Sequence, residues 1–233
     1  MDFSIHSGHI VIGPVDAPGD NQEYERFTIT GNPDGSRTLR AITRSPRGDL
    51  LRDVNQMAGP DWRPIEGTTR LFFKGECHGT ALRRVIGDRL LSYVWSPGQE
   101  TDFAEFDAPP HMTIGFHPIM HEAWKMNFID VKRDDYQEVL IHTVSNTWNG
   151  RSIGHGQKLV SEAKFAGHED VTVPAGTFPC EKFIWQTPFD KELHIWRTGP
   201  QNILVKELVA KGDKEGTLYQ LAALEVVEVA AQA

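Results

Sequence analysis

Short runs in which apolar and polar residues alternate recur along this chain, and turn-forming residues separate them. Tyr24 to Thr30 and Ser36 to Arg44 are two such runs, and Asn-Pro-Asp-Gly at 32–35 lies between them. Proline presets one dihedral angle of a turn and glycine accepts a positive φ, so these residues predict an antiparallel hairpin. Gly87-Asp88 joins two further runs in the way a two-residue hairpin loop would. The pattern is typical of strands that bury one face.

About a dozen runs of this kind can be identified, whereas helical spacing is confined to residues 118–128, with Ile119, Glu122, Ala123 and Met126 on one face. A sheet of so many antiparallel strands normally curls or closes on itself, because this removes exposed edges. The sequence predicts an all-β fold, either an antiparallel rolled sheet or a lipocalin-like β-barrel, with at most one short helix. The expected strands are 24–30, 36–44, 49–57, 68–74, 78–86, 89–95, 136–145, 156–166, 168–173, 177–187, 192–198, 202–211 and 217–229.

The 233 residues are enough for one large β domain with a sizeable core. We expect a single domain over 1–233. Residues 1–22, rich in glycine and proline, predict an irregular N-terminal arm with a short strand at Ile10 to Ile12. Residues 107–130 join two halves that both read as strands and turns. Cys77 and Cys180 are far apart and outside any CxxC spacing, so two free thiols are expected.

Composition excludes several classes of partner. The formal net charge is -8, whereas binding to nucleic acid requires a clustered positive field. No segment has the features of a signal peptide or the length of a membrane span, so we expect a cytoplasmic protein without a membrane partner. No P-loop, GxGxxG, GxSxG or paired CxxC motif is present, so we expect no cofactor. The oligomeric state stays open.

The run Asp-Val-Thr-Val-Pro-Ala-Gly-Thr-Phe-Pro-Cys-Glu-Lys-Phe at 170–183 resembles a strand, turn and strand of a bacterial family of uncharacterised spiral β-roll proteins. Trp-Arg-Thr-Gly and Leu-Val-Lys-Glu-Leu, between residues 196 and 208, resemble the next two strands of that family. The resemblance covers the C-terminal third of the chain and implies a fold. It implies no activity, because the family has no shared catalytic residues to transfer.

The connecting segment 107–130 concentrates histidine, acidic, methionine and aromatic residues. Apolar walls with a few titratable groups are what a pocket for a small organic molecule needs. His117 and His121 are four residues apart, and His111 or Glu122 could complete a metal site. However, Pro118 allows His117 only at the start of a helix, and no HExxH motif is present, so a metal is not the leading expectation.

Without a metal, a histidine with a pKa near neutrality can act as general base beside an acidic proton donor. The candidate catalytic residues are His117, His121, His142, Glu122 and Asp130. His142 lies in an apolar strand, where a histidine that is only packed in the core is an equally good explanation. Other candidate donors are Asp102 and Glu105.

Further side chains are expected to bind the substrate. Arg83 could hold an oxyanion or a carboxylate. In the last strand of the N-terminal half, Leu91, Tyr93 and Trp95 share a face that we expect to be core or pocket wall. Alternation also places Phe183 with Trp185 and His194 with Trp196, and an aromatic wall would form if these two faces coincide; a core role is the alternative. The candidate substrate-binding residues are His111, Trp124, Arg83, Tyr93, Trp95, Phe183, Trp185, His194 and Trp196.

These features favour a cofactor-independent acid–base enzyme, such as a lyase, dehydratase or isomerase, acting on a hydrophobic or aromatic small molecule in a β-barrel cavity. The first alternative is a non-catalytic carrier that binds a lipophilic ligand in the same cavity. The second is a metal-dependent hydrolase that uses His117 and His121. Substitution of the histidines would separate an enzyme from a carrier, because an enzyme would keep its ligand and lose turnover.

Overall fold

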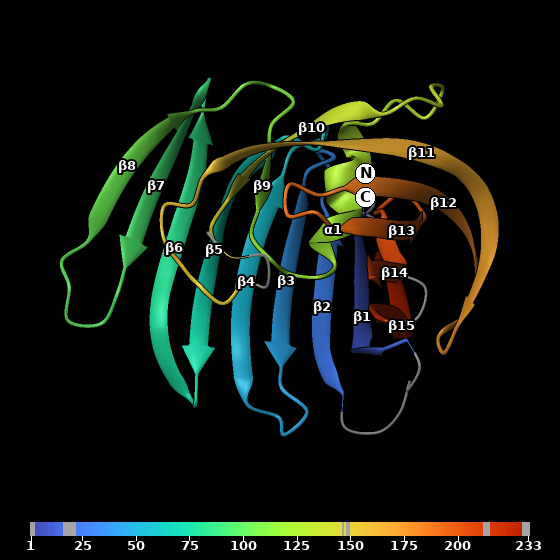
Figure 1. Ribbon diagram of the computed structural model, residues 1–233, viewed down its shortest axis with the longest axis horizontal. Coiled ribbons are helices and arrows are strands. Elements are labelled where there is room, and N and C mark those ends of the chain that lie inside the picture. Colours follow the sequence, from blue (N-terminus) through green and yellow to red (C-terminus); the bar gives the residue numbers. More distant parts are fainter. Residues whose placement is uncertain (1–2, 16–21, 146, 148–149, 212–214, 230–233) are drawn as a thin grey trace.

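A single large sheet of fifteen strands forms most of the computed structural model (Figure 1). The structure describes residues 3–15, 22–145, 147, 150–211 and 215–229. The strands follow the order β8-β7-β6-β5-β4-β3-β2-β1-β15-β14-β13-β12-β11-β10-β9. Their bounds are β1 Phe3–Pro14, β2 Glu23–Gly31, β3 Arg37–Arg44, β4 Leu50–Ala58, β5 Pro64–Phe73, β6 Glu76–Ile86, β7 Arg89–Trp95, β8 Asp102–Asp107, β9 Thr113–Gly115, β10 Gln137–Thr143, β11 Lys158–Val173, β12 Gly176–Gln186, β13 Glu192–Thr198, β14 Ile203–Lys211 and β15 Glu215–Val229.

The chain begins and ends at the centre of this sheet. β1 pairs antiparallel with β2 on one side and with β15 on the other, and Phe3 lies opposite Val229. From β1 the strands follow one another outward to the edge strand β8, after which the chain crosses to β9 at the other edge. β9 pairs parallel with β10, and the remaining strands return to the centre. Residues from both halves of the chain therefore lie on the inner face of the same sheet.

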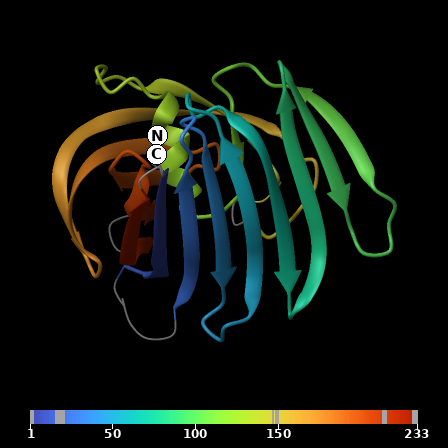
Figure 2. The ribbon, with the colours of Figure 1, turned by 180° about the vertical axis from the view of Figure 1, so that it is seen from behind.

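The sheet curls without closing, since the order of its strands ends at β8 on one side and at β9 on the other. The roll surrounds the helix α1, His121–Lys125, which a turn of 3-10 helix at Met126–Phe128 extends (Figures 1 and 2). This confirms the nearly all-β fold, and the rolled sheet is the form observed. It also confirms the short helix predicted within 118–128.

Both predicted hairpins are present. Gly35 adopts a positive φ of 82°, and its N–H donates to the Asn32 carbonyl oxygen at 2.9 Å. Gly87 has a φ of 59° and connects β6 to β7. Cys77 and Cys180 are free thiols, as expected. Within the described residues, no helix has both the length and the apolar character needed to cross a membrane.

The short strand predicted at Ile10 to Ile12 is part of β1, but the expectation of an irregular arm is wrong for the rest of Phe3–Pro14, which forms a central strand; residues 1–2 and 16–21 lie outside the described residues. The interspersed serine, glycine and histidine hide the alternation of this strand. Gly8 is needed there, because a Cβ atom added to it would lie 2.2 Å from a carbon of the Phe27 ring. The short strands β8 and β9 were also not predicted from the sequence.

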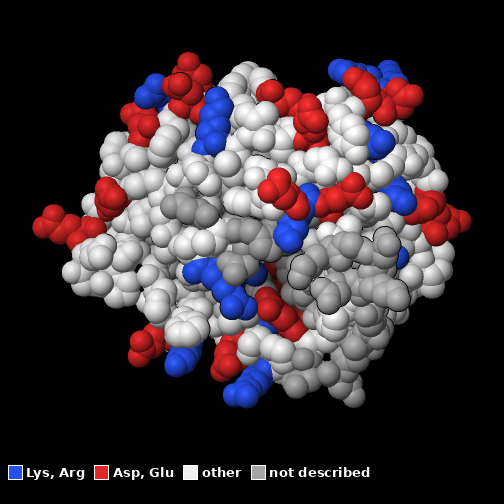
Figure 3. Space-filling view, viewed as in Figure 1, with Lys and Arg blue, Asp and Glu red and all other residues white. Residues whose placement is uncertain are grey.

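The interior of the roll holds two apolar clusters. The larger one packs α1 against the inner face of the C-terminal half, with Met120, Phe183 and Ile195 fully buried. The smaller one lies around Phe116 and Leu90 under the N-terminal half. On the outside, acidic and basic side chains are interspersed over the face seen in Figure 3.

Candidate active site

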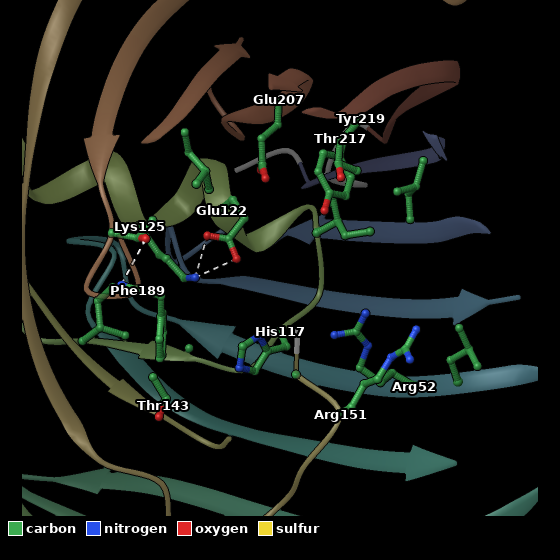
Figure 4. A pocket seen from close by; sticks show the side chains of 18 of the residues that line it. Arg52, His117, Glu122, Lys125, Thr143, Arg151, Phe189, Glu207, Thr217 and Tyr219 are labelled. Carbon is green, nitrogen blue, oxygen red and sulfur yellow. Dashed lines mark hydrogen bonds and ion pairs between the residues drawn. The ribbon is translucent and has the colours of Figure 1, made fainter. Parts of the chain in front are cut away.

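A cavity of about 560 Å³ lies inside the roll. Strands of both halves, the segment 115–125 and the loops around residues 150 and 188 line it (Figure 4). Its volume is in the range of pockets that hold small organic molecules. The apolar part of its wall consists of Ile12, Leu51, Leu71, Phe72, Phe73, Ile119, Ile141, Leu159, Trp185, Phe189 and Leu193.

His117 lies between β9 and α1 and lines the cavity. Its backbone is in the left-handed region, with φ at 64°, which residues other than glycine seldom adopt. Its Nε2 atom is buried and has no hydrogen-bond partner among the described residues. Burial lowers the pKa of the imidazole well below its usual value, and the charges of Lys125 and Arg52 lower it further. The ring is therefore neutral.

Glu207 on β14 is a second titratable group in the cavity wall, and it was not predicted from the sequence. Its Oε2 atom is buried and has no hydrogen-bond partner among the described residues. Burial raises the pKa of this carboxyl well above its usual value, and the nearby Glu122 adds to the effect. This favours the protonated acid. Tyr219 lies directly opposite on β15, and burial also raises the pKa of its hydroxyl.

The signal for Glu207 is present in the sequence. Val205, Glu207 and Val209 alternate along β14, and all three are buried on the inner face. A carboxylic acid on the apolar face of a strand must be neutral, paired or hydrogen-bonded, because burial of an isolated charge is costly. Glu207 could have been found by looking for charged residues at the same alternate positions of a strand as its apolar residues.

Glu122 and Lys125, both on α1, also line the cavity. The Lys125 Nζ atom donates to both carboxylate oxygens of Glu122, at 2.7 and 2.6 Å. It also lies 5.0 Å from the centre of the Trp185 ring. The two charges neutralise each other, so Glu122 is an ion-pair partner in this structure and is less suited than Glu207 to donate a proton.

Glu25 on β2 supports the site from behind. Its carboxylate accepts hydrogen bonds from the backbone N–H groups of Ile119 and Met120, each at 2.9 Å. The Thr43 hydroxyl donates a third bond at 2.9 Å. Burial nevertheless raises the pKa of this carboxyl. These bonds fix the start of α1 and thereby the position of His117. Glu25 was also not predicted, although it shares the inner face of β2 with Phe27.

His121 and Trp124 pack beside the cavity rather than in its wall. The His121 ring lies edge-on between Phe116 and Trp124, with centroid distances of 6.3 and 6.2 Å. Its Nδ1 atom has no partner among the described residues, and burial lowers its pKa well below the usual value. The Trp124 indole N–H donates to the carbonyl oxygen of Gln201 at 3.0 Å.

His142 and Arg83 lie elsewhere, in a group that we call the sealed cluster: Arg83, Ser92, His142 and His155. Arg83, Ser92 and His142 are completely buried, and none of them lines the cavity. The Ser92 hydroxyl is 2.5 Å from His155 Nδ1, and His155 Nε2 is 3.0 Å from a carboxylate oxygen of Asp102. This resembles a catalytic triad, but a buried Ser92 gives a substrate no access to its hydroxyl.

Polar atoms in the sealed cluster are poorly satisfied. Neither ring nitrogen of His142 has a hydrogen-bond partner among the described residues, and the same holds for Arg83 Nε. The His142 ring packs against Phe106, with a centroid distance of 4.5 Å. Burial and the charge of Arg83 lower the pKa of His142 to about 4. Burial also lowers the pKa of Arg83 to about 10.

The remaining predicted residues do not form one site. His111 and Asp130 are exposed in loops, outside the cavity wall. The face of β7 that carries Tyr93 and Trp95 is the outer one, because Leu90, Ser92 and Val94 are the buried residues of this strand. The expectation that it is core or pocket wall is therefore wrong.

The predicted aromatic wall is divided between two faces of the sheet. Trp185 lies opposite Leu193, and His194 lies opposite Ile184, so the face of Trp185 does not carry His194. Phe183 and Trp185 point inward, and Trp185 lines the cavity. His194 forms a 2.6 Å ion-pair contact with Glu192 on the other face. Trp196 is buried there between Lys182 and Lys206, whose ammonium groups are 4.8 and 4.9 Å from its ring.

The fold and the cavity together define an open, rolled β-sheet protein with an interior cavity. No family model and no curated protein matches the sequence. Among solved structures, the chain is similar to a β-barrel-like protein of the domain of unknown function DUF1849 from Brucella abortus. The TM-score is 0.59 at 7% identity, and the match covers 97% of this chain and 98% of the other. This similarity extends the β-barrel-like fold over the whole chain.

Two other structures cover similar lengths with lower TM-scores. A candidate lipoprotein from Parabacteroides distasonis has a TM-score of 0.43 at 13% identity, with 97% of this chain and 96% of that chain covered. A candidate exported protein with a YmcC-like fold from Bacteroides fragilis has a TM-score of 0.39 at 10% identity, with coverages of 96% and 95%.

Proposed function

We propose that this protein is a cofactor-independent acid–base enzyme, a lyase, dehydratase or isomerase, that acts on a hydrophobic or aromatic small molecule. The observation that carries the proposal is the presence of two unpartnered titratable atoms, His117 Nε2 and Glu207 Oε2, in the wall of one largely apolar cavity. Burial holds the first group in its basic form and favours the acidic form of the second. Such a pair is suited to moving a proton in each direction at neutral pH.

The roles follow from the protonation states. In a dehydration, His117 Nε2 accepts a proton from the carbon next to a carbonyl group of the substrate. The electron pair of that C–H bond forms a carbon–carbon double bond, and the departing hydroxyl takes the proton of Glu207 and leaves as water. In an isomerisation, the proton returns to a different carbon. Neither reaction needs an oxidant or a reductant.

A carrier for a lipophilic ligand is the competing proposal. The apolar side chains of the cavity wall, such as Ile12 and Leu193, are compatible with an enzyme and with a carrier. A carrier, however, has no use for two buried titratable atoms without partners, since each lowers the stability of the empty protein. For the metal-dependent hydrolase, no group of three His, Cys, Asp or Glu residues in the described chain is arranged to hold a metal ion. His117 and His121 therefore lack a third ligand there.

The resemblance of residues 170–183 to spiral β-roll proteins concerns the fold of this proposed enzyme and not its chemistry. A cytoplasmic location, a small molecule as the only partner, and no binding to nucleic acid or membranes remain predictions from the sequence.

The proposal is tested by hydrogen exchange at carbon. The protein is incubated in D₂O with aryl carbonyl compounds such as benzylacetone, phenylpyruvate and aryl β-hydroxy ketones, and deuterium uptake next to the carbonyl is followed by NMR. We expect uptake faster than in buffer for at least one compound. Glu207→Gln should reduce product formation about a hundredfold while calorimetry detects nearly unchanged binding. Binding without exchange or turnover of any compound would favour the carrier and overturn the enzyme.

A further inference from the structure

Two arginine side chains of the cavity lie away from Phe189. Phe189 lies at one end of the view in Figure 4, and the guanidinium groups of Arg52 and Arg151 lie at the other. Trp185 and Leu193, which lie opposite each other on β12 and β13, line the same cavity. A ligand that fills the cavity therefore meets an aromatic and aliphatic surface along part of its length and cationic groups at one end.

Arg52 has few acceptors for its donors. Its side chain is only 12% exposed, and its nearest carboxylate oxygen, on Glu23, is 3.8 Å away. No hydrogen bond joins its guanidinium to another group within the described part of the chain. A guanidinium carries five N–H donors in a planar fork that matches a carboxylate. A largely buried guanidinium of this kind is stabilised when a ligand supplies oxygen atoms that accept its hydrogen bonds.

His117 is close to this cationic group. A Cβ atom added at Gly150 would lie 2.6 Å from Arg52 Nη1 and 2.9 Å from His117 Cγ, so the guanidinium and the imidazole flank the same glycine. We propose that the substrate is an organic carboxylate whose anionic group binds Arg52 and whose aromatic or aliphatic body lies against Trp185, Leu193 and Phe189. This places the carbon next to the carboxylate beside the proposed base. The inference rests on the proposed function and names its substrate class.

The test compares an aromatic carboxylate with its neutral amide and with an aromatic phosphate. Binding of cinnamate, cinnamamide and phenyl phosphate to the wild-type protein is measured by calorimetry at neutral pH. We expect cinnamate to bind at least about tenfold more tightly than cinnamamide, because charge-assisted hydrogen bonds are stronger than neutral ones. Arg52→Gln should weaken cinnamate about tenfold and leave cinnamamide unchanged. Arg40→Gln is the matched control, since that side chain is 63% exposed on the outside, and it should change neither affinity.

Several results would overturn the inference: equal affinity for cinnamate and cinnamamide, no measurable binding of cinnamate, or equal losses in Arg52→Gln and Arg40→Gln. Tighter binding of phenyl phosphate than of cinnamate would overturn the assignment to a carboxylate. Circular dichroism shows whether each variant is folded. This test measures the affinity for ligands, whereas the test of the proposed function measures deuterium uptake at carbon. Exchange of the neutral benzylacetone without any preference for anions would therefore refute this inference alone.

Discussion

His117 and His142 both have buried ring nitrogens that lack hydrogen-bond partners among the described residues, yet their surroundings differ. His117 faces a cavity of about 560 Å³, together with Glu207 and Arg52. We call these three residues the cavity cluster. His142 belongs to the sealed cluster and packs against Phe106 with no exposed surface. A ligand in the cavity can hydrogen-bond to the His117 ring, whereas the His142 ring has no surface that solvent reaches in the folded state. A buried polar atom without a hydrogen-bond partner therefore indicates a function only where a ligand has room to reach that atom and form a hydrogen bond with it.

The largest expected effect is on catalytic activity, when each of the two histidines is substituted separately. His117→Asn removes the proposed base, and asparagine tolerates the positive φ of 64° better than alanine does. We expect the catalysed deuterium uptake to fall about a hundredfold or more with nearly unchanged ligand binding. His142→Leu should leave uptake within about twofold of the wild type, since His142 does not line the cavity.

The opposite pattern, with loss of activity in His142→Leu alone, would transfer the proposed chemistry to the sealed cluster. His121→Gln adds a further comparison, because His121 packs against Trp124 beside the cavity. A smaller loss than in His117→Asn is expected for a residue that only supports the position of the segment 117–124.

The second effect concerns the pH dependence of stability. The pKa of His142 is about 4 in the folded protein and about 6.5 in the unfolded chain. Between these values the unfolded chain binds more protons, so the contribution of His142 to stability is complete above pH 6.5 and is lost as the pH falls toward 4. The loss amounts to about 3 kcal/mol. His142→Leu should therefore lose about 3 kcal/mol less than the wild type between pH 7 and pH 4.

Chemical denaturation at the two pH values measures this difference. His111→Gln, at an exposed position, is the control and should follow the wild-type curve. At pH 7 His142→Leu should be at least as stable as the wild type, because leucine removes two buried nitrogens without partners. Parallel pH curves for His142→Leu and the wild type would show that His142 is protonated or solvated in the folded protein.

The sequence predicted the strands far better than it predicted the site. Local predictions were accurate to the residue or nearly so for the strands at 89–95 and 192–198 and for the turn at 32–35. Local alternation and turn chemistry determine these elements. The central strand Phe3–Pro14 was missed apart from Ile10 to Ile12. Its glycine and serine residues weaken the alternation, and its position depends on β15 at the far end of the chain.

The site depends on which face of each strand points inward, and this is decided by the roll as a whole. His117 was predicted, but Glu207 and Glu25 were passed over as ordinary charged residues of strands. Tyr93 and Trp95 were assigned to the core or a pocket wall because they share one face with Leu91, yet the buried side chains of β7 are Leu90, Ser92 and Val94. Periodicity identifies a strand with two faces, and only the pairing of distant strands determines which face is covered.

The smallest expected effect separates the two clusters within one loop. Gly150 has a φ of 62°, and an added Cβ would collide with Arg52 and the His117 ring of the cavity cluster. The Gly154 carbonyl oxygen accepts a hydrogen bond from the Arg83 guanidinium of the sealed cluster, and a Cβ added at Gly154 meets nothing within 4 Å. Gly150→Ala should cost about 1 kcal/mol or slightly more in unfolding free energy and should reduce cinnamate affinity severalfold. Gly154→Ala should change both by less than the error of measurement.

The pair tests the cavity cluster directly, because the two glycines are four residues apart and the substitution is the same. Gly150 lines the cavity, and a methyl group there would displace the guanidinium or the imidazole that flank it. If Gly150→Ala loses stability but binds cinnamate as the wild type does, Arg52 and His117 do not contact the ligand together. If Gly154→Ala weakens binding as much as Gly150→Ala, the loop acts on the cavity as a unit, and the separation of the two clusters fails.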